Sequence, residues 1–183
     1  MEKDKMGYPF NKLGFGKMNE YVTTVIEIGK GSSMKIEWRR QEEFFALDRV
    51  EPQIFAKPCN YGFIPQTLDE DGDELDTLVV TAEAIPMGTV IEETRVIGVL
   101  NFEDDGEMDH KVICVPADDR HYGKIMSHEE LGDSWHRQVE HHFTHYKDLK
   151  KPGSTKVLGF GSAEEAWKII AECSDRAQTQ KWW

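Results

Sequence analysis

Carboxylates are densest in residues 69–76, where the sequence reads DEDGDELD. Within this stretch Asp71, Asp73 and Asp76 surround a single glycine, Gly72. Two carboxylates about 5 Å apart repel each other by roughly 3 kcal/mol at an effective dielectric constant near 20. Three or more of them at one turn therefore predict a hard cation among them.

Two other interpretations of this stretch are an EF-hand calcium loop and a solvated acidic turn between strands. An EF-hand loop beginning at Asp69 needs a glycine at the position of Glu74 and a bidentate glutamate at the position of Val80, so it fails twice. The solvated turn stays open as long as this stretch is considered alone.

A second acidic cluster, DDGEMD at residues 104–109, is followed by His110 and Lys111 and also lies between two predicted strands. Two oxygen-rich turns are typical of a Mg²⁺ site, because Mg²⁺ binds a few carboxylates together with waters and substrate oxygens. A polar hairpin loop is the alternative for the second cluster alone.

Basic residues interrupt the predicted strands near these acids. Lys35 and Glu37 are two positions apart and so point to one face, and Arg49 ends the next strand. Asp109 and Lys111 show the same alternation. Each pair could be a cross-strand ion pair of small effect. Together they predict a site that holds metal cations and phosphate oxygens, as phosphoryl transfer requires.

These residues must be positioned by a mainly β fold. Short runs rich in β-branched and apolar residues, bounded by Gly, Pro or Asp, predict strands at Tyr21–Ile28, Met34–Trp38, Phe44–Arg49, Thr77–Ala82, Val90–Phe102 and His110–Val115.

After Ser127 the pattern becomes helical. Apolar residues from Trp135 to Leu149 recur at spacings of four and three, and Pro152-Gly153 ends this predicted helix. Ser162 begins a capping box ahead of a second amphipathic helix through Cys173. The order of elements predicts an α+β, mainly β fold: a compact barrel with flanking C-terminal helices.

Composition limits the class of protein. The 183 residues, 39% of them apolar, predict one domain over 1–183 in which 1–20 form a poorly specified N-terminal arm. A net charge of −12 argues against a nucleic-acid partner. No signal peptide or membrane-spanning segment is expected. The three cysteines form no C-x-x-C pair, which favours reduced thiols and a cytoplasmic location.

Taken together, the motifs resemble the soluble family I inorganic pyrophosphatases of the bacterial type. The match runs from about Tyr21 to the last helix, in order and at near-constant spacing. It covers Val25–Ile28, Lys35–Glu37, Asp48-Arg49, Pro58–Ile64, Asp71–Asp76, Gly98–Leu100, Asp104-Asp105, Asp109, Lys111 and His145–Leu149.

The resemblance implies an OB-like five-stranded β-barrel and Mg²⁺-dependent hydrolysis of pyrophosphate to two phosphates, by an activated water and without a covalent intermediate. It also implies several Mg²⁺ per site, with Mn²⁺ as a substitute, and a homo-oligomer, most simply a hexamer. A non-catalytic β module that binds divalent cations is the alternative. That module would leave the lysines and arginine without a purpose.

The resemblance also implies roles for individual residues. Asp73 would be the base that deprotonates the attacking water, and Glu37 would support the site. The expected metal ligands are Asp71, Asp76 and Asp109, with Glu27, Asp104 and Asp105 for metals that arrive with substrate. The expected phosphate-binding residues are Lys35, Arg49, Tyr61, Lys111, Tyr146 and Lys147.

The sequence departs from the family pattern at a few positions. Lys57 replaces a tyrosine found in many members, and we do not include it in the predicted site. Glu74 replaces a proline, and Asp105 is shorter than the usual glutamate; neither change removes an oxygen ligand. The segment Val90–Val99 is one residue longer than in typical bacterial members, which predicts a bulge or a longer loop.

Four histidines, His136, His141, His142 and His145, lie on one predicted helix. The i, i+4 pair of His141 and His145 would permit a zinc site, but no third ligand is evident. The family resemblance instead implies a subunit interface, which would make assembly sensitive to pH between about 5 and 8. Both interpretations stay open at this point.

Overall fold

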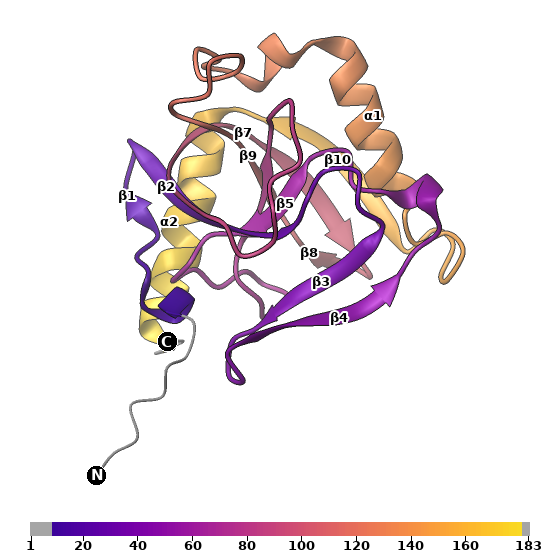
Figure 1. Ribbon diagram of the computed structural model, residues 1–183, viewed down its shortest axis with the longest axis horizontal. Helices are drawn as coiled ribbons and strands as arrows, with labels where there is room; N and C mark the ends of the chain where they lie inside the picture. Colours follow the sequence, from indigo (N-terminus) through magenta and orange to yellow (C-terminus); the bar gives the residue numbers. More distant parts are fainter. Residues whose placement is uncertain (1–8, 181–183) are drawn as a thin grey trace.

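A closed β-barrel forms the centre of the protein. The computed structural model describes residues 9–180 (Figure 1). Its strands pair in the order β2 (Tyr21–Ile28), β5 (Asn60–Phe63), β6 (Asp76–Val79), β9 (Lys111–Pro116) and β7 (Val90–Asp104), and β7 pairs back with β2. The β6–β9 pair is parallel and the other pairs are antiparallel. The predicted five-stranded barrel is confirmed.

Further strands extend this barrel. On its edges lie β1 (Gly16–Lys17), paired with β2, β10 (Thr155–Gly161), paired with β7, and the two-residue β8 (Glu107–Met108). A separate hairpin is formed by β3 (Met34–Arg39) and β4 (Phe44–Val50). The 3₁₀ turns are η1 (Pro9–Lys12), η2 (Gln53–Phe55) and η3 (His128–Leu131).

The barrel closes around a buried interior. Strands β2 and β9 and the middle of β7 are buried on both faces, with Ile97, Leu100 and Ile113 in the largest core cluster. Strand β5 crosses β2 so closely that a Cβ on Gly62 would lie 2.0 Å from the carbonyl oxygen of Val25. Only glycine fits there, and its neighbour Tyr61 is thereby held over the pocket described below.

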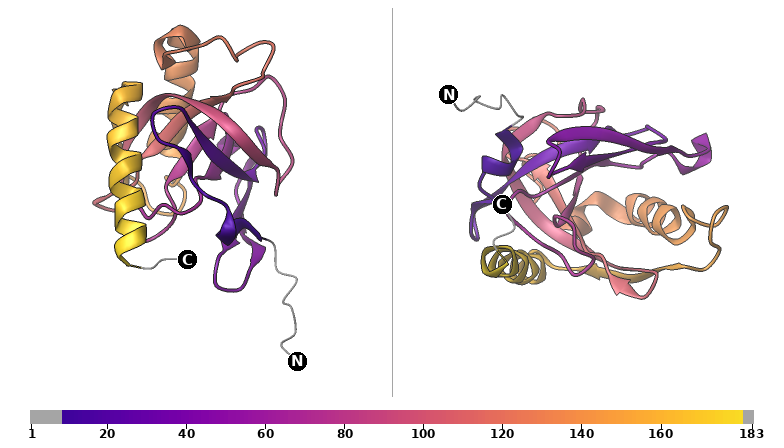
Figure 2. Two further views of the ribbon diagram at one scale, coloured as in Figure 1. Left: turned by 90° about the vertical axis from the view of Figure 1, so that its left-hand side faces the viewer. Right: turned by 90° about the horizontal axis from the view of Figure 1, so that it is seen from below.

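Two helices cover the barrel. Helix α2 (Ala163–Thr179) packs against β7 through buried Ala166 and Ile170. Ser162 is its N-cap as predicted, because Ser162 Oγ accepts a hydrogen bond from Glu165 N at 3.2 Å. The second contact of the predicted capping box is not found between these two described residues, and Glu165 Oε1 instead accepts from Asn101 Nδ2 at 2.6 Å. Helix α1 (Gly132–His145) contacts β10 and lies across from the β3–β4 hairpin (Figure 2). No helix within residues 9–180 has the length and apolarity needed to cross a membrane.

The structure corrects several predicted boundaries. Helix α1 ends at His145 rather than near Pro152, because the chain turns there: Asp148 N donates to His145 O at 2.9 Å, and Leu149 is left 72% exposed. Strand β6 ends at Val79, and β7 continues to Asp104. A register shift between Val96 and Gly98 places the expected bulge in β7.

Three features of the fold were not predicted from the sequence. Strand β5 is four residues long and contains Gly62, and β10 contains two glycines with mixed burial, so neither shows a clear period of two. Part of the N-terminal arm is folded onto the barrel: the ring of Phe10 packs edge-on against Trp38 at 4.9 Å. Residues 1–8 of the predicted arm lie outside the described residues.

Candidate active site

The first acidic turn is shaped by its own backbone. Gly72 has a φ of +94°, and Asp73 N donates to Asp71 Oδ1 at 3.1 Å, so the two carboxylates leave the turn side by side. Leu75, which is fully buried, fixes the end of the turn, and its N–H donates to Thr67 Oγ1 at 3.0 Å.

Asp69 connects this turn to the second acidic turn. Its carboxylate is buried and accepts hydrogen bonds from Glu70 N at 2.9 Å and from His110 N at 3.2 Å. Its own N–H donates to Asp73 O at 2.8 Å. The sequence marked Asp69 only as extra charge, whereas here it holds the two acidic turns in a fixed relation.

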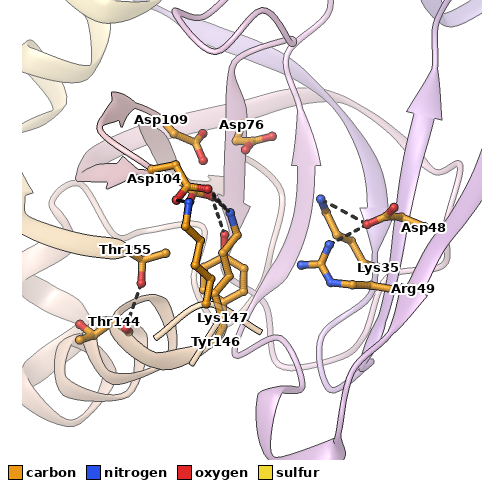
Figure 3. Close-up of polar contacts among 12 residues, drawn as sticks. Lys35, Asp48, Arg49, Asp76, Asp104, Asp109, Thr144, Tyr146, Lys147 and Thr155 are labelled. Atoms are coloured by element: carbon orange, nitrogen blue, oxygen red, sulfur yellow. Dashed lines mark hydrogen bonds and ion pairs between the residues drawn. The ribbon is translucent and has the colours of Figure 1, made fainter. Parts of the chain in front are cut away.

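The second acidic turn is a tight hairpin. Asp105 and Gly106 both have positive φ values, 53° and 89°, as in a two-residue turn between antiparallel strands. Asp104, the last residue of β7, accepts hydrogen bonds from Lys147 and from Tyr146 Oη, the latter at 3.0 Å (Figure 3). Lys151 lies 2.5 Å from Asp105.

Strand register brings a buried lysine between two aspartates. Asp76 on β6 lies opposite Lys111 on the parallel strand β9. Lys111 is 2% exposed, and its Nζ contacts Asp109 and lies 2.5 Å from Asp76 Oδ2. Burial lowers the pKa of Lys111, but Asp109 and Asp76 more than offset this and raise it above its ordinary value. Tyr61 Oη also donates to Asp76.

The β3–β4 hairpin supplies the opposite side with cations (Figure 3). Lys35 and Arg49 face each other in register. Lys35 Nζ lies 2.5 Å from Glu37, and Arg49 pairs with Glu51 and, at 2.6 Å, with Asp48. These pairs are partly exposed.

All the predicted site residues line three adjoining pockets. The largest, called here the catalytic pocket, is lined by Glu27, Lys35, Glu37, Tyr61, Asp71, Asp73, Asp76, Asp104, Asp109, Lys111 and Tyr146, among others. A smaller pocket shares Lys35 and Tyr146 with it and adds Arg49. A third shares Asp71, Asp104 and Asp109 with it and adds Asp105 and Lys147.

The catalytic pocket also contains residues that were not predicted. Lys57, excluded on the sequence, lines both the catalytic pocket and the smaller one. Arg39 also lines the pocket and lies 2.9 Å from Glu37. Glu74 lies 3.3 Å from Arg40 and so links the acidic turn to the end of β3. In the sequence, the replacement of proline by Glu74 marked this position as unusual for the family. Its partner Arg40 could not be predicted, because tertiary structure brings the two residues together.

Comparisons with known proteins identify the family. The profile of the inorganic pyrophosphatase family matches residues 24–178. The chain belongs to the inorganic pyrophosphatase family. It is 57% identical over 162 residues to the inorganic pyrophosphatase of Neisseria meningitidis serogroup B, which covers 87% of this chain and 90% of that protein. The Haemophilus influenzae enzyme is 55% identical over 156 residues, covering 85% and 88% of the two chains.

Solved structures give the same result. The inorganic pyrophosphatase from Neisseria gonorrhoeae superposes with a TM-score of 0.89 at 53% identity, covering 92% of this chain and 99% of that one. The Thermus thermophilus enzyme gives 0.84 at 37% identity, covering 91% and 97%. The predicted family and fold are confirmed, and the activity is that of an inorganic diphosphatase, the hydrolysis of pyrophosphate. The non-catalytic alternative is thereby set aside.

Members of this family depend on metals, and the carboxylates of the pocket fit that requirement. Burial and the charge of Asp109 raise the pKa of Asp71 to about 7, and burial raises the pKa of Glu27 well above its usual range. Asp104 Oδ1 is buried without a hydrogen-bond partner among the described residues. A cation would relieve both the repulsion and the unsatisfied oxygen.

The described carboxylates nevertheless do not form a complete metal-coordination site. Within residues 9–180, no three His, Cys, Asp or Glu groups converge closely enough to hold an ion. In the active site Lys111 contacts Asp76 and Asp109, so these two carboxylates already share one positive charge.

The four histidines of α1 divide into two groups. His136 Nε2 shares a hydrogen bond of 2.9 Å with Nδ1 of His128 in η3. The other three line a separate cavity beneath η2, called here the histidine cavity. In neither group do three ligands converge closely enough to hold an ion within the described part of the chain, so the zinc interpretation gains no support.

Proposed function

We propose that this inorganic pyrophosphatase uses Mg²⁺ and direct attack by water, with Asp73 as the base and no covalent intermediate. The observation that carries the proposal is the meeting of two charge sets in one pocket. Carboxylates come from the two acidic turns and β6, and cations come from the distant β3–β4 hairpin and from β9. A site that bound only metal ions would not need the positively charged side chains.

The metal ligands in this proposal are carboxylates from four segments. Asp71, Asp76 and Asp109 would hold the tightly bound ions, and Glu27, Asp104 and Asp105 would bind those that enter with substrate. Mg²⁺ bound there would lower the pKa of the attacking water and neutralise charge on the phosphates. Displacement of Lys111 from Asp76 would free that carboxylate for an ion and the ammonium for a phosphate.

Asp73 is suited to accept the proton. It lines the catalytic pocket, and it is exposed rather than tied up in an ion pair within the described residues. Although the residue as a whole is exposed, its carboxylate is partly desolvated inside the pocket, and this desolvation, followed by the negative charge of Glu37, raises its pKa above the ordinary value. A raised pKa makes Asp73 a stronger base at neutral pH.

The phosphate oxygens would be bound by fixed donors. Lys35, Arg49, Lys111 and Lys147 supply positive charge, and Tyr61 and Tyr146 supply hydroxyl groups. Glu37 supports this set, because its two oxygens lie 2.5 Å from Lys35 and 2.9 Å from Arg39. Charge-assisted hydrogen bonds of this kind stabilise the negative charge that grows on the leaving phosphate.

The direct test is release of phosphate from pyrophosphate by the purified protein. We expect turnover with Mg²⁺, loss of turnover in a chelator, and recovery when Mg²⁺ is added back in excess. Mn²⁺ should restore part of the activity. Absence of turnover at any Mg²⁺ concentration would contradict the proposal.

Assembly and location are further parts of the proposal. We propose a homo-oligomer, most simply a hexamer, in the cytoplasm, and residues 1–183 as a single pyrophosphatase domain. The support is the family resemblance, together with Cys59, Cys114 and Cys173, which are free and buried as expected in a reducing compartment. Sizing columns at pH 8 and pH 5 test assembly: a monomer at pH 8 contradicts it, and a smaller species at pH 5 supports histidines at the interface.

A further inference from the structure

Lys57 is held at the junction of two pockets. It lies between η2 and β5, and its backbone is fixed on both sides: Lys57 N donates to Ser32 O, and Lys57 O accepts from Gly31 N, each at 2.9 Å. Its side chain lines both the catalytic pocket and the smaller pocket that contains Arg49. The backbone therefore directs this ammonium into the site.

Aromatic rings surround the ammonium of Lys57. Its Nζ lies 4.5 Å from the ring centre of Tyr61, 5.2 Å from that of Tyr146 and 5.5 Å from that of Phe143. Ring faces attract a cation, but they do not replace the hydrogen bonds that an ammonium loses on burial. The ring contacts therefore leave the ammonium free to donate hydrogen bonds to an anion.

Lys57 differs from the other cations that line these pockets. Lys35, Arg39, Arg49, Lys111 and Lys147 each pair with at least one carboxylate. None of the ion pairs among the described residues includes Lys57. Its ammonium is therefore available to an anion.

The pKa of Lys57 reflects the electrostatic cost of burying its ammonium. Burial, and then repulsion by Lys111, lower the pKa of Lys57 to about 7. Asp76 acts in the opposite direction, and Lys35 and Arg49 add to the lowering. A bound phosphate would reverse the balance by placing negative charge beside the ammonium.

We propose that Lys57 Nζ binds a phosphate oxygen of pyrophosphate, on the phosphate group that lies where the catalytic pocket meets the smaller pocket. This inference rests on the proposed function. The smaller pocket contains Lys35, Arg49 and Lys57 but not Asp73. The phosphate held at that junction is the one farther from the base, so Lys57 stabilises the leaving phosphate and contributes to its retention as product.

The test compares Lys57→Met, which removes the charge at similar size, with Lys57→Arg, which keeps it. Lys156→Met is the matched control, because Lys156 is exposed on β10. Steady-state phosphate release gives kcat and KM for pyrophosphate, and inhibition by inorganic phosphate gives the product affinity.

We expect Lys57→Met to lower kcat/KM by about 10- to 100-fold and to weaken phosphate inhibition, as loss of a hydrogen bond to a charged group predicts. Lys57→Arg should recover most of the loss, and Lys156→Met should match wild type. Wild-type KM and phosphate inhibition in folded Lys57→Met would overturn the inference. So would equal losses in Lys57→Met and Lys57→Arg, because that result indicates packing rather than charge.

Binding of imidodiphosphate, an analogue that is not hydrolysed, separates the two claims. Calorimetry with Mg²⁺ measures its affinity for wild type and Lys57→Met without any turnover. If wild type binds the analogue but releases no phosphate from pyrophosphate, the proposed function fails while the Lys57 contact is still measured. Equal affinities in the two proteins overturn the contact. Lys57→Gln replaces Lys57→Met if the latter does not fold.

Discussion

Tyr146 lies between two cavities that differ in the charge state of a buried ionisable group. On one side, in the catalytic pocket, Lys111 stays charged between Asp76 and Asp109. On the other side, in the histidine cavity, the imidazole of His142 stacks on Tyr146 at 5.7 Å, and its buried Nε2 has no partner among the described residues.

The pKa values follow from this difference. Burial, and then the nearby charge of Lys57, lower the pKa of His142 to about 3, so this imidazole stays neutral. In the catalytic pocket, Lys111 keeps its charge because Asp76 and Asp109 lie beside it, and Lys57 would keep its charge with an anion bound. A buried group in this fold is thus either paired or neutral, and each case predicts a different response to mutation.

The largest expected effect is removal of the buried cation by Lys111→Met. Asp76 and Asp109 would remain as two buried carboxylates without a positive charge beside them, which should lower the free energy of unfolding by about 3 to 5 kcal/mol in the absence of metal. Urea unfolding measures this. Mg²⁺ should raise the stability of the variant more than that of wild type, since it replaces the lost charge. A smaller response to Mg²⁺ in the variant would contradict the pairing argument.

An intermediate effect is expected from the neutral imidazole. A pKa lowered in the folded state means that stability is fully present above pH 6.5 and is lost as the pH falls toward 3. At pH 5 wild type should have lost about 2 kcal/mol relative to His142→Phe, which cannot bind the proton. Unfolding at pH 7 and pH 5 measures the slope, with the exposed His121→Gln as control. Parallel slopes in wild type and His142→Phe would reject a buried neutral histidine.

A smaller effect on stability is expected at the rim of the pocket. The side chains of Lys35 and Glu37 are 34% and 30% exposed, so Lys35→Met should change the free energy of unfolding by less than about 1 kcal/mol. Its kcat/KM should still fall by about 10- to 100-fold, because the charge acts on substrate. If Lys35→Met destabilises the protein as much as Lys111→Met, the distinction between buried and exposed pairs is wrong.

The smallest effect is expected from zinc in the histidine cavity. His141 and His145 lie 4.7 Å apart between ring centres, but no third ligand accompanies them in the described residues. Zn²⁺ added in the presence of excess Mg²⁺ should therefore shift the melting temperature of wild type and His141→Gln equally. A shift found in wild type alone would identify a zinc site.

Much of the pocket could be predicted because its acidic part is local in sequence. The turns at Gly72 and at Asp105-Gly106 are encoded by a few neighbouring residues, and both are found as expected. The ordered motifs of a known family then supplied the partners on other strands. Lys35, Arg49 and Lys147 lie where that resemblance implied, in pockets that adjoin the acidic turns.

The parts that could not be predicted depend on contacts across the fold. Strand β5 is set by its close approach to β2 at Gly62 rather than by any periodicity of its own. Lys57 joins the site because η2 and β5 turn its side chain inward. Asp69 connects the two acidic turns, because its carboxylate accepts a hydrogen bond from the N–H of His110, 41 residues later. A single sequence contains no sign of that pairing.

The most direct test of the account is phosphate release from pyrophosphate with Mg²⁺ by wild type and Asp73→Asn at equal folded concentration. The two proteins should have similar unfolding curves, because Asp73 is exposed. We predict that the variant loses about 100-fold or more in kcat, the contribution typical of a general base. Turnover equal to that of wild type would contradict the assignment of Asp73 and, with it, the proposed mechanism.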